Sequence, residues 1–189
     1  MVQVLKKEIR VRIFEAALDV FYQKDFKSAT MQEIAEKAGV PTGLIYSYFK
    51  NKEALFDEIV RPVVLILPEA LKRAEEANGH AFDKFVSIER ECILTLFDRR
   101  REFIVLIDKS MGTSHSSAKE DLIRLIEEHI KISIKKKTGA EYDSLFVHIL
   151  AGNFTESLLE IARHYKSREW AVGMLDLMAR HYYLGSSSF

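Results

Sequence analysis

The sequence predicts an all-α protein, and two observations carry that prediction. Apolar residues recur at helical spacing along nearly the whole chain, whereas the two-residue alternation of a half-buried strand is almost absent. The 189 residues include only three prolines and eight glycines, a content that favours long helices with few tight turns. A chain of this length suffices for one or two compact domains.

The composition is that of a soluble globular protein, with 48% apolar and 30% charged residues. Lys and Arg together number 28, as do Asp and Glu, so the net charge of zero does not support a polybasic coat. The single Cys92 excludes an intramolecular disulfide and a cysteine-based zinc site. The amino-terminal segment lacks the apolar block of a signal peptide, and the apolar run near 62–68 is far shorter than the ~20 residues of a bilayer span. We therefore expect a cytoplasmic protein without a membrane partner.

The first predicted helix covers residues 5–24. Its apolar side chains fall on one stripe, while lysines, arginines and Asp19 occupy the rest of the surface, as in an amphipathic helix. The residues of the stripe are Ile9, Ile13, Ala17, Val20 and Phe21.

Two short helices are predicted next, over about 30–38 and 41–48. Thr30 and Glu33 have the spacing of a capping box, which satisfies free amides at the start of a helix. Gly39 suits the left-handed residue that ends a helix, and Pro41 fits the first turn of the following one. Two short helices joined by a turn that contains glycine form a helix-turn-helix.

The remaining helices are predicted near 52–77, 80–98, 101–111, 117–138, 142–166 and 168–184. Asn51 is the expected cap of the first of them. Pro62 removes one main-chain hydrogen bond inside that helix, so we expect a kink or a break there. Pro68 either repeats this effect or begins a new helix.

Charge divides unevenly along the chain. Residues 1–52 carry nine Lys and Arg against six Asp and Glu, whereas residues 53–189 carry nineteen against twenty-two. The smaller amino-terminal part is thus the more plausible partner of a polyanion. We expect a helix-turn-helix domain over 1–52, linked through the helix that starts at 52, and a helical domain over 53–189.

In the second short helix, Ile45 and Phe49 lie four residues apart and are expected to face inward. The positions left for the outer face are mostly small or polar, so the helix could approach a groove floor closely. They are Thr42, Gly43, Tyr46 and Ser47, with Leu44 beside them.

These segments together resemble the DNA-binding domain of TetR-family transcriptional regulators. The resemblance covers about residues 5–60. It rests on Phe21-Tyr22 and Phe26, on the runs 30–35 and 38–40, and on the run 45–55, Ile-Tyr-Ser-Tyr-Phe-Lys-Asn-Lys-Glu-Ala-Leu. The rest of the chain resembles the family only in its length and helical architecture. The resemblance implies a helix-turn-helix DNA-binding domain followed by a larger helical ligand-binding and dimerisation domain.

The resemblance also implies how the protein would work. A homodimer would place one recognition helix per subunit in successive major grooves of a palindromic operator, with half-sites about 34 Å apart. We assign contacts with phosphates to Thr30, Tyr46, Tyr48 and Lys52. Contacts with base edges are assigned to Thr42, Gly43, Leu44 and Ser47, with Gln32 as an addition from the preceding helix. Core packing is the alternative for the aromatic residues of this set and stays open for Tyr46.

The larger helical part is expected to hold the dimer seam and an effector site. Two stripes are candidates for the seam, namely Phe146, Leu150, Phe154, Leu158 and Ile161, and Trp170, Met174, Leu177 and Met178. Candidate walls of an effector cavity are Phe85, Ile88, Cys92, Phe103, Ile107 and Met111, which favour a small hydrophobic or amphipathic molecule. An ordinary core within one chain is the alternative for both sets. No metal or cofactor site is expected.

Two other classes of protein are alternatives to a DNA-binding regulator. An enzyme is disfavoured, because the six histidines are scattered and the chain has no H-E-x-x-H, G-x-S-x-G or phosphate-binding glycine loop. An interaction protein or ligand-binding module that keeps the helix-turn-helix without binding DNA is the second alternative, consistent with the modest basicity. The function favoured is that of a ligand-responsive regulator, a repressor in the family's usual mode.

Overall fold

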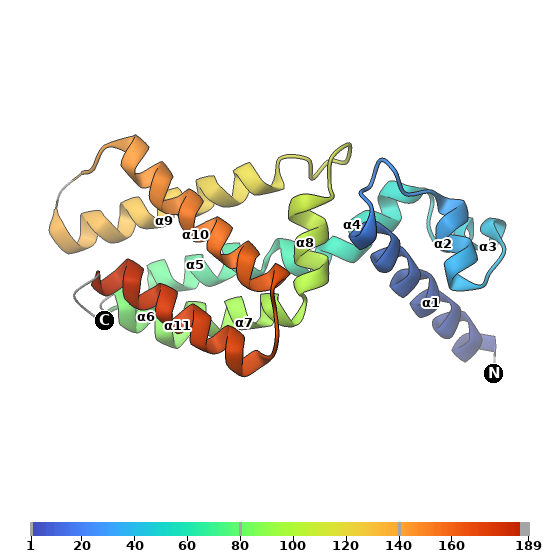
Figure 1. Ribbon diagram of the computed structural model, residues 1–189, viewed down its shortest axis with the longest axis horizontal. Coiled ribbons are helices and arrows are strands. Elements are labelled where there is room, and N and C mark those ends of the chain that lie inside the picture. The colour runs from blue at the N-terminus through green and yellow to red at the C-terminus, as the bar shows by residue number, and fades with distance from the viewer. Residues whose placement is uncertain (1, 80, 140, 186–189) are drawn as a thin grey trace. The chain divides into compact units, whose positions relative to one another are not determined.

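The computed structural model describes residues 2–79, 81–139 and 141–185, and within these ranges all regular structure is helical (Figure 1). This confirms the all-α prediction. The chain divides into two compact units, Met1–Pro62 with Arg101–Ala118, and Val63–Arg100 with Lys119–Phe189. The first unit thus includes residues 101–118 from the middle of the chain. The sequence-based division into 1–52 and 53–189 assigns these residues to the second domain.

The first unit contains α1 (Val2–Gln23), α2 (Met31–Ala38), α3 (Thr42–Tyr46), most of α4 (Lys52–Val64) and most of α8 (Arg100–Asp108). The apolar stripe of α1 faces the core from Ile13 onward, while Ile9 is only half-buried. Phe21, Phe26 and Phe56 pack together, with ring centroids 5.3–6.0 Å apart. Edge-to-face and offset ring contacts of this kind stabilise a small core that unites α1, the following loop and α4.

Hydrogen bonds explain why residues 101–118 belong to the first unit. The Phe26 amide donates to the carbonyl oxygen of Lys109 at 2.9 Å. In the loop after α8, the Ser114 amide donates to Glu53 Oε1 at 3.2 Å, and His115 Nε2 lies 3.1 Å from Asp57 Oδ1. The loop is therefore fastened to α4 at two successive turns.

The break after α4 falls at Leu65 rather than at Pro62. Pro62 lies inside α4, which continues to Val64, and α5 (Ile66–Glu76) then begins. Pro68 occupies the first turn of α5, where its missing N–H group costs no helical hydrogen bond. This confirms the alternative in which Pro68 begins a new helix.

The second unit contains α5, α6 (Ala81–Lys84), the π-helical turn η1 (Phe85–Glu89), α7 (Arg90–Asp98), α9 (Ala118–Thr138), α10 (Ser144–Arg163) and α11 (Arg168–Leu184). The single helix expected near 80–98 is thus interrupted by a π turn, which shifts the helical register by one residue. Such turns occur frequently at functional sites. The core of the unit includes Phe85, Phe97, Leu158 and Leu175.

Helix α10 is long and apolar enough to cross a membrane, judged by length and composition alone, and it is the single such helix in the described ranges. In the structure it packs against its own unit, with Val147, Ala151, Leu158 and Leu159 buried. Core helices of globular proteins pass the same test of length and composition, and the burial of these side chains is that of a core helix.

Candidate nucleic-acid interface

Helix α2 begins with the capping box expected from the sequence. The Glu33 amide donates to Thr30 Oγ1 at 3.1 Å, and the Thr30 amide donates to Glu33 Oε2 at 3.0 Å. Hydrogen bonds from Lys24, which contributes most, and from the Thr30 amide and hydroxyl to the Glu33 carboxylate hold its pKa below the usual value. Met31, Ile34, Ala35 and Ala38 are buried, so the cap fixes one face of α2 against the core.

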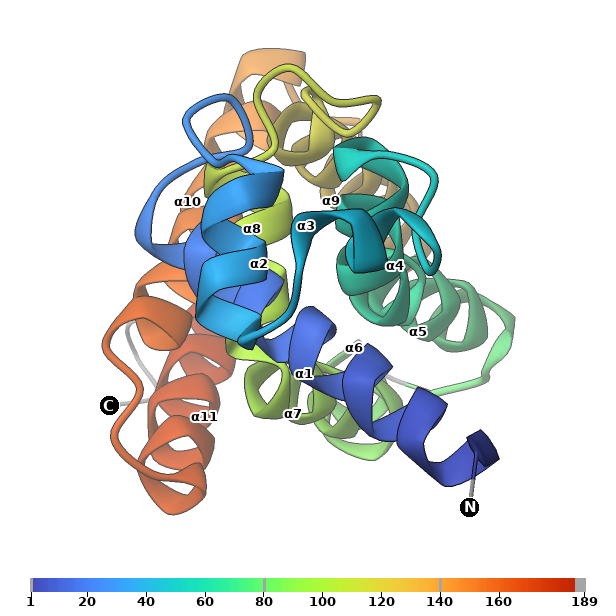
Figure 2. The same cartoon turned by 90° about the vertical axis from the view of Figure 1, so that its right-hand side faces the viewer.

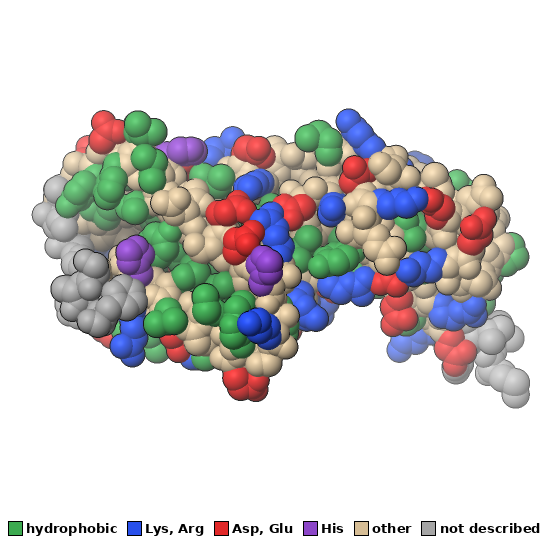
Figure 3. All heavy atoms as spheres, in the orientation of Figure 1, with side chains coloured by type: hydrophobic (Ala, Val, Ile, Leu, Met, Phe, Trp, Pro, Cys, Tyr) green, Lys and Arg blue, Asp and Glu red, His purple; other side chains and the backbone are tan. Residues whose placement is uncertain are grey.

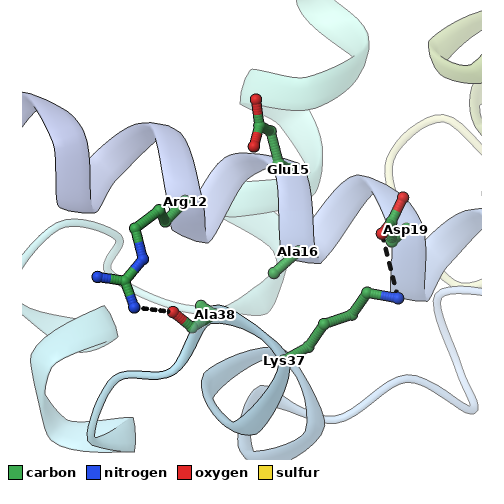
Figure 4. A pocket seen from close by; sticks show the side chains of 6 residues that line it. All are labelled: Arg12, Glu15, Ala16, Asp19, Lys37 and Ala38. Atoms are coloured by element: carbon green, nitrogen blue, oxygen red, sulfur yellow. Dashed lines mark hydrogen bonds and ion pairs between the residues drawn. The ribbon is translucent and has the colours of Figure 1, made fainter.

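The turn between α2 and α3 depends on Gly39, whose φ of +64° and ψ of +41° lie in the left-handed region. Arg12 of α1 stabilises the turn from outside, because its guanidinium donates to the carbonyl oxygen of Ala38, as Figure 4 shows, and also to that of Gly39. A Cβ atom at position 39 would come within 2.9 Å of Nη2 of Arg12. The left-handed conformation therefore favours glycine at this turn, whereas the Arg12 guanidinium is the end of a flexible side chain and can shift.

The groove between α1 and α2 is a shallow open depression (Figure 4). It is lined by Arg12, Glu15, Ala16, Asp19, Lys37 and Ala38. Lys37 Nζ lies 3.1 Å from Asp19 Oδ2, and Arg101 of α8 also pairs with Asp19. The hydrogen bond from Arg101 is the main cause that lowers the pKa of Asp19. These charged side chains bind one another and fix α2 and α8 on α1.

Helix α3 ends at Tyr46, two residues before the end of the predicted range 41–48, and Ser47 and Tyr48 follow it in a turn. Ile45 and Phe49 are buried, which confirms their inward orientation. Tyr46 is 52% exposed, and Gly43 and Ser47 are exposed too. Thr42, Leu44 and Tyr48 are half-buried. Figure 2 views the unit from the side on which α3 and the amino-terminal end of α1 lie. Tyr46 thus protrudes beside small side chains that allow close approach of a partner.

The polar candidates differ in how far their donors are free. Ser47 Oγ donates to the carbonyl oxygen of Leu44 at 2.6 Å, and Gln32 Nε2 donates to Glu36 Oε1 at 3.1 Å. Gln32 is exposed on α2, and both side chains could exchange these local bonds for others. Thr30 is exposed, although its hydroxyl takes part in the capping box.

Lys52 has a structural role that sequence reasoning missed. Its Nζ donates to the carbonyl oxygens of Phe26 and Ala29 at 2.6 and 2.7 Å, and it lies 4.4 Å from the centre of the Phe26 ring. Desolvation lowers the pKa of the ammonium group. Two of its three donors are therefore used within the chain. Lys50, two residues earlier, is exposed.

The six candidate residues for an effector cavity do not gather in one unit. Phe85, Ile88 and Cys92 belong to the second unit, whereas Phe103, Ile107 and Met111 belong to the first. Phe103 is buried in the first unit and Met111 is exposed, so neither unit by itself can supply all six as one wall. Helical spacing could not show that residues 101–118 fold with the first unit.

The candidate residues of the dimer seam also separate by burial. Leu158 and Ile161 are buried within the unit, which supports the core interpretation for these two. Phe146 and Leu177 are exposed, and the other candidates are half-buried: Leu150, Phe154, Trp170, Met174 and Met178. The dimer seam therefore stays a prediction. Its accessible candidate residues lie on the amino-terminal half of α10 and on the exposed face of α11.

No group of three or more His, Cys, Asp or Glu side chains in the described ranges is arranged to hold a metal ion.

The helix-turn-helix segment also matches known proteins. Residues 13–59 match the family model described as bacterial regulatory proteins, tetR family. An uncharacterized HTH-type transcriptional regulator of Bacillus subtilis, YhgD, is 32% identical over 126 residues, which cover 66% of this chain and 64% of that protein. The match thus spans slightly less than two thirds of that relative's length.

Solved structures show the same fold. A TetR-family transcriptional regulator from Bordetella parapertussis superposes with a TM-score of 0.76 over 96% of this chain and 97% of its own, at 15% identity. The transcriptional regulator FadR from Bacillus subtilis, solved in complex with stearoyl-CoA, gives a TM-score of 0.63 over 93% and 98%, at 17% identity.

Proposed function

We infer that the chain belongs to the TetR family of transcriptional regulators, whose family model matches residues 13–59, and we propose that it is a homodimeric repressor that binds a palindromic operator through α3. The observation that carries this proposal is the outer face of α3, where the protruding Tyr46 stands beside Gly43 and Ser47 on a helix fixed by Gly39. We place the protein in the cytoplasm with its DNA.

The roles proposed for the first unit follow from exposure. Thr42, Gly43, Leu44 and Ser47 approach base edges, where small side chains bring the helix close to the groove floor. Phosphates are contacted by Tyr46, Tyr48 and Lys50 and by Thr30, the N-cap of α2, while Gln32 of α2 adds a further contact with the duplex. Lys52 contributes by holding the loop before α2 rather than by a direct contact.

A second copy of the chain is the proposed partner of α10. Leu145, Phe146 and Ile149 are exposed on its first turns, and Leu145 is 64% exposed. Hydrophobic side chains gather over this end of α10, whereas charged side chains gather over its other end (Figure 3). Large exposed apolar groups on a soluble protein mark interaction surfaces. Two-fold pairing through this face would match the two-fold symmetry of a palindromic operator.

The second unit is the proposed effector-binding part. FadR, which has the same fold, was solved with stearoyl-CoA. For this chain we propose a small hydrophobic or amphipathic effector that binds against the apolar face of Phe85, Ile88 and Cys92. Release from the operator requires that the effector bind the DNA-incompetent state more tightly, by about 5.5 kcal/mol to reverse a 99:1 population.

Selection from a random 30-bp duplex library, followed by fluorescence anisotropy with the selected duplex, tests the proposal. We expect enriched duplexes that carry two inverted half-sites about one helical turn apart. Tyr46→Phe removes only the exposed hydroxyl and should weaken the affinity several-fold. Tyr142→Phe removes an equally exposed hydroxyl from the second unit and should leave it unchanged. Enrichment of no duplex would favour the alternative, a helical module that does not bind DNA.

A further inference from the structure

Charged and polar side chains gather inside the second unit. Glu89 at the end of η1, His129 of α9 and Lys84 of α6 are buried, with Glu89 only 3% exposed. Glu75 of α5 and Tyr183 of α11 are half-buried beside them. A buried charge is costly unless it is paired or neutralised, so each ionisable side chain of this cluster is expected either to have a partner of opposite charge or to be neutral.

The imidazole ring of His129 lies between two carboxyl groups. Its Nδ1 is 3.5 Å from Glu75 Oε1, and its Nε2 is 3.5 Å from Glu89 Oε1. Nδ1 has no hydrogen-bond partner at normal distance. A neutral imidazole carries one N–H group, so one of its nitrogens faces a carboxyl group with a lone pair. That contact becomes favourable when this carboxyl group carries a proton.

Burial decides which group carries the proton. Desolvation raises the pKa of Glu89 to about 7, against the opposing effects of the Tyr183 hydroxyl, 3.3 Å away, and of Lys84. Desolvation also lowers the pKa of His129, although Glu75 opposes this. In water an imidazole holds a proton more tightly than a carboxylate, and the interior reverses that order. A protonated Glu89 can then donate to Nε2 while Nδ1–H points at Glu75.

The other charged groups around the cluster already have partners. Lys84 Nζ donates to the carbonyl oxygen of Ala74 at 2.8 Å, and Lys136 Nζ of α9 donates to the main-chain oxygen of Glu75 at 3.0 Å. On α7, Arg90 pairs with Asp176 of α11 at 2.7 Å, and Glu91 pairs with Arg168 at 2.8 Å. Burial and the neighbouring Glu89 raise the pKa of Tyr183, which keeps this hydroxyl a donor.

We propose that Glu75, His129 and Glu89 form a proton-binding site inside the second unit, and that one proton held between η1 and α9 stabilises their packing near neutral pH. The site joins α5, η1, α9 and α11, so the stability of the whole unit responds to its occupancy. The inference does not rest on DNA binding, which involves residues of the first unit.

The linkage between protons and folding gives the site a distinctive signature. Between about pH 4.5 and 6.5, the unfolded chain carries its proton on His129, with Glu89 ionised. The folded chain carries one proton as well, but on Glu89. Both states bind one proton, so the pair adds no pH dependence to stability in this window.

Each single variant should create a difference in the number of bound protons between the folded and unfolded states, and its stability should then depend on pH. In Glu89→Gln, burial lowers the pKa of folded His129, which therefore binds less proton than unfolded His129, so stability relative to wild type rises with pH. In His129→Gln, only folded Glu89 binds a proton, so relative stability falls with pH. Each slope should approach tenfold in the folding equilibrium constant per pH unit. The double variant should regain the flat profile.

Urea unfolding at pH 5.0 to 6.5 measures these slopes. The chain has one tryptophan, Trp170 in α11, whose fluorescence reports on the second unit. Glu69→Gln, an exposed site on α5, is the matched control and should parallel the wild type. Opposite slopes of the two single variants support the site. Single variants that both parallel the wild type would overturn it.

A measurement on the unmodified protein covers the case in which a variant does not fold. Carbon-13 NMR of the Glu89 carboxyl group should show a titration midpoint near pH 7, with the ring signals of His129 moving at the same midpoint. A Glu89 midpoint below pH 5 would overturn the proposal. DNA binding by the selected duplex is read separately, so it can succeed or fail without bearing on this result.

Discussion

The ammonium group of Lys52 donates a hydrogen bond to the main-chain carbonyl oxygen of Phe26 at 2.6 Å. This bond, with a second one to Ala29, joins the start of α4 to the loop that precedes α2. The side chain that sequence reasoning assigned to a DNA phosphate therefore stabilises the helix-turn-helix from within.

Lys52→Met keeps most of the aliphatic length of the side chain but removes its donors. We expect a loss of about 1–3 kcal/mol in the free energy of unfolding of the first unit, because two part-buried carbonyl oxygens lose their partner. Chemical denaturation measures this loss. Lys50→Met, at an exposed neighbouring position, should leave stability unchanged and reduce the salt slope of duplex binding instead. The reverse pattern would return the phosphate contact to Lys52.

Gly39 and Gly43 provide a matched pair of glycine substitutions. Gly39→Ala places a Cβ atom on a left-handed backbone and should destabilise the first unit by more than about 1 kcal/mol. Gly43→Ala meets no atom within 4 Å and lies in a helix, so stability should hold or rise slightly. Its effect should instead be weaker duplex binding, since the added methyl group stands on the outer face of α3. Thermal unfolding measures the stability of each variant, and fluorescence anisotropy measures its affinity for the duplex. A loss of stability in Gly43→Ala but not in Gly39→Ala would contradict these roles.

The capping box should contribute measurably to the free energy of unfolding. Thr30→Ala removes the acceptor for the Glu33 amide, and we expect a loss of about 1 kcal/mol. Thr95→Ala is the control, because that hydroxyl only bonds back to Glu91 within α7. Equal effects of the two substitutions in urea denaturation would show that the cap contributes nothing specific.

The exposed apolar residues at the start of α10 predict how the chain assembles. Leu145→Glu with Ile149→Glu places two charges on this face and should convert a dimer into a monomer of 21.8 kDa, as measured by light scattering. Val86→Glu alters an equally exposed apolar residue of η1 and should leave the dimer intact. A wild-type chain that is monomeric, or a double variant that remains dimeric, would exclude α10 from the seam.

Local rules account for the parts of this protein that the sequence predicted well. Thr30 with Glu33, Gly39 and the Asn51 cap, whose Oδ1 accepts from the Ala54 amide at 2.8 Å, all depend on residues within a few positions of one another. The inward orientation of Ile45 and Phe49 likewise follows from helical spacing alone.

Long-range contacts account for what was missed. The partners of Lys52 lie 23 and 26 residues away, and His115 reaches Asp57 across 58 residues, so no local pattern signals either contact. The same holds for His129, whose charged neighbours come from α5 and η1. Periodicity predicted that Leu158 lies on an apolar stripe, but it could not distinguish a buried stripe from an interface.

DNA cleavage by a chelate attached at position 47 tests most directly the central claim, that α3 contacts the duplex. In a Cys92→Ser background, which removes the single native cysteine, Ser47→Cys can carry an iron chelate that cleaves nearby DNA by hydroxyl radicals. With the selected duplex, the account predicts two cleavage clusters related by two-fold symmetry, one in each half-site. The same chelate on Ser87→Cys in the second unit should give background cleavage. Cleavage from Ser47→Cys no stronger than from Ser87→Cys would contradict the claim that α3 contacts the duplex.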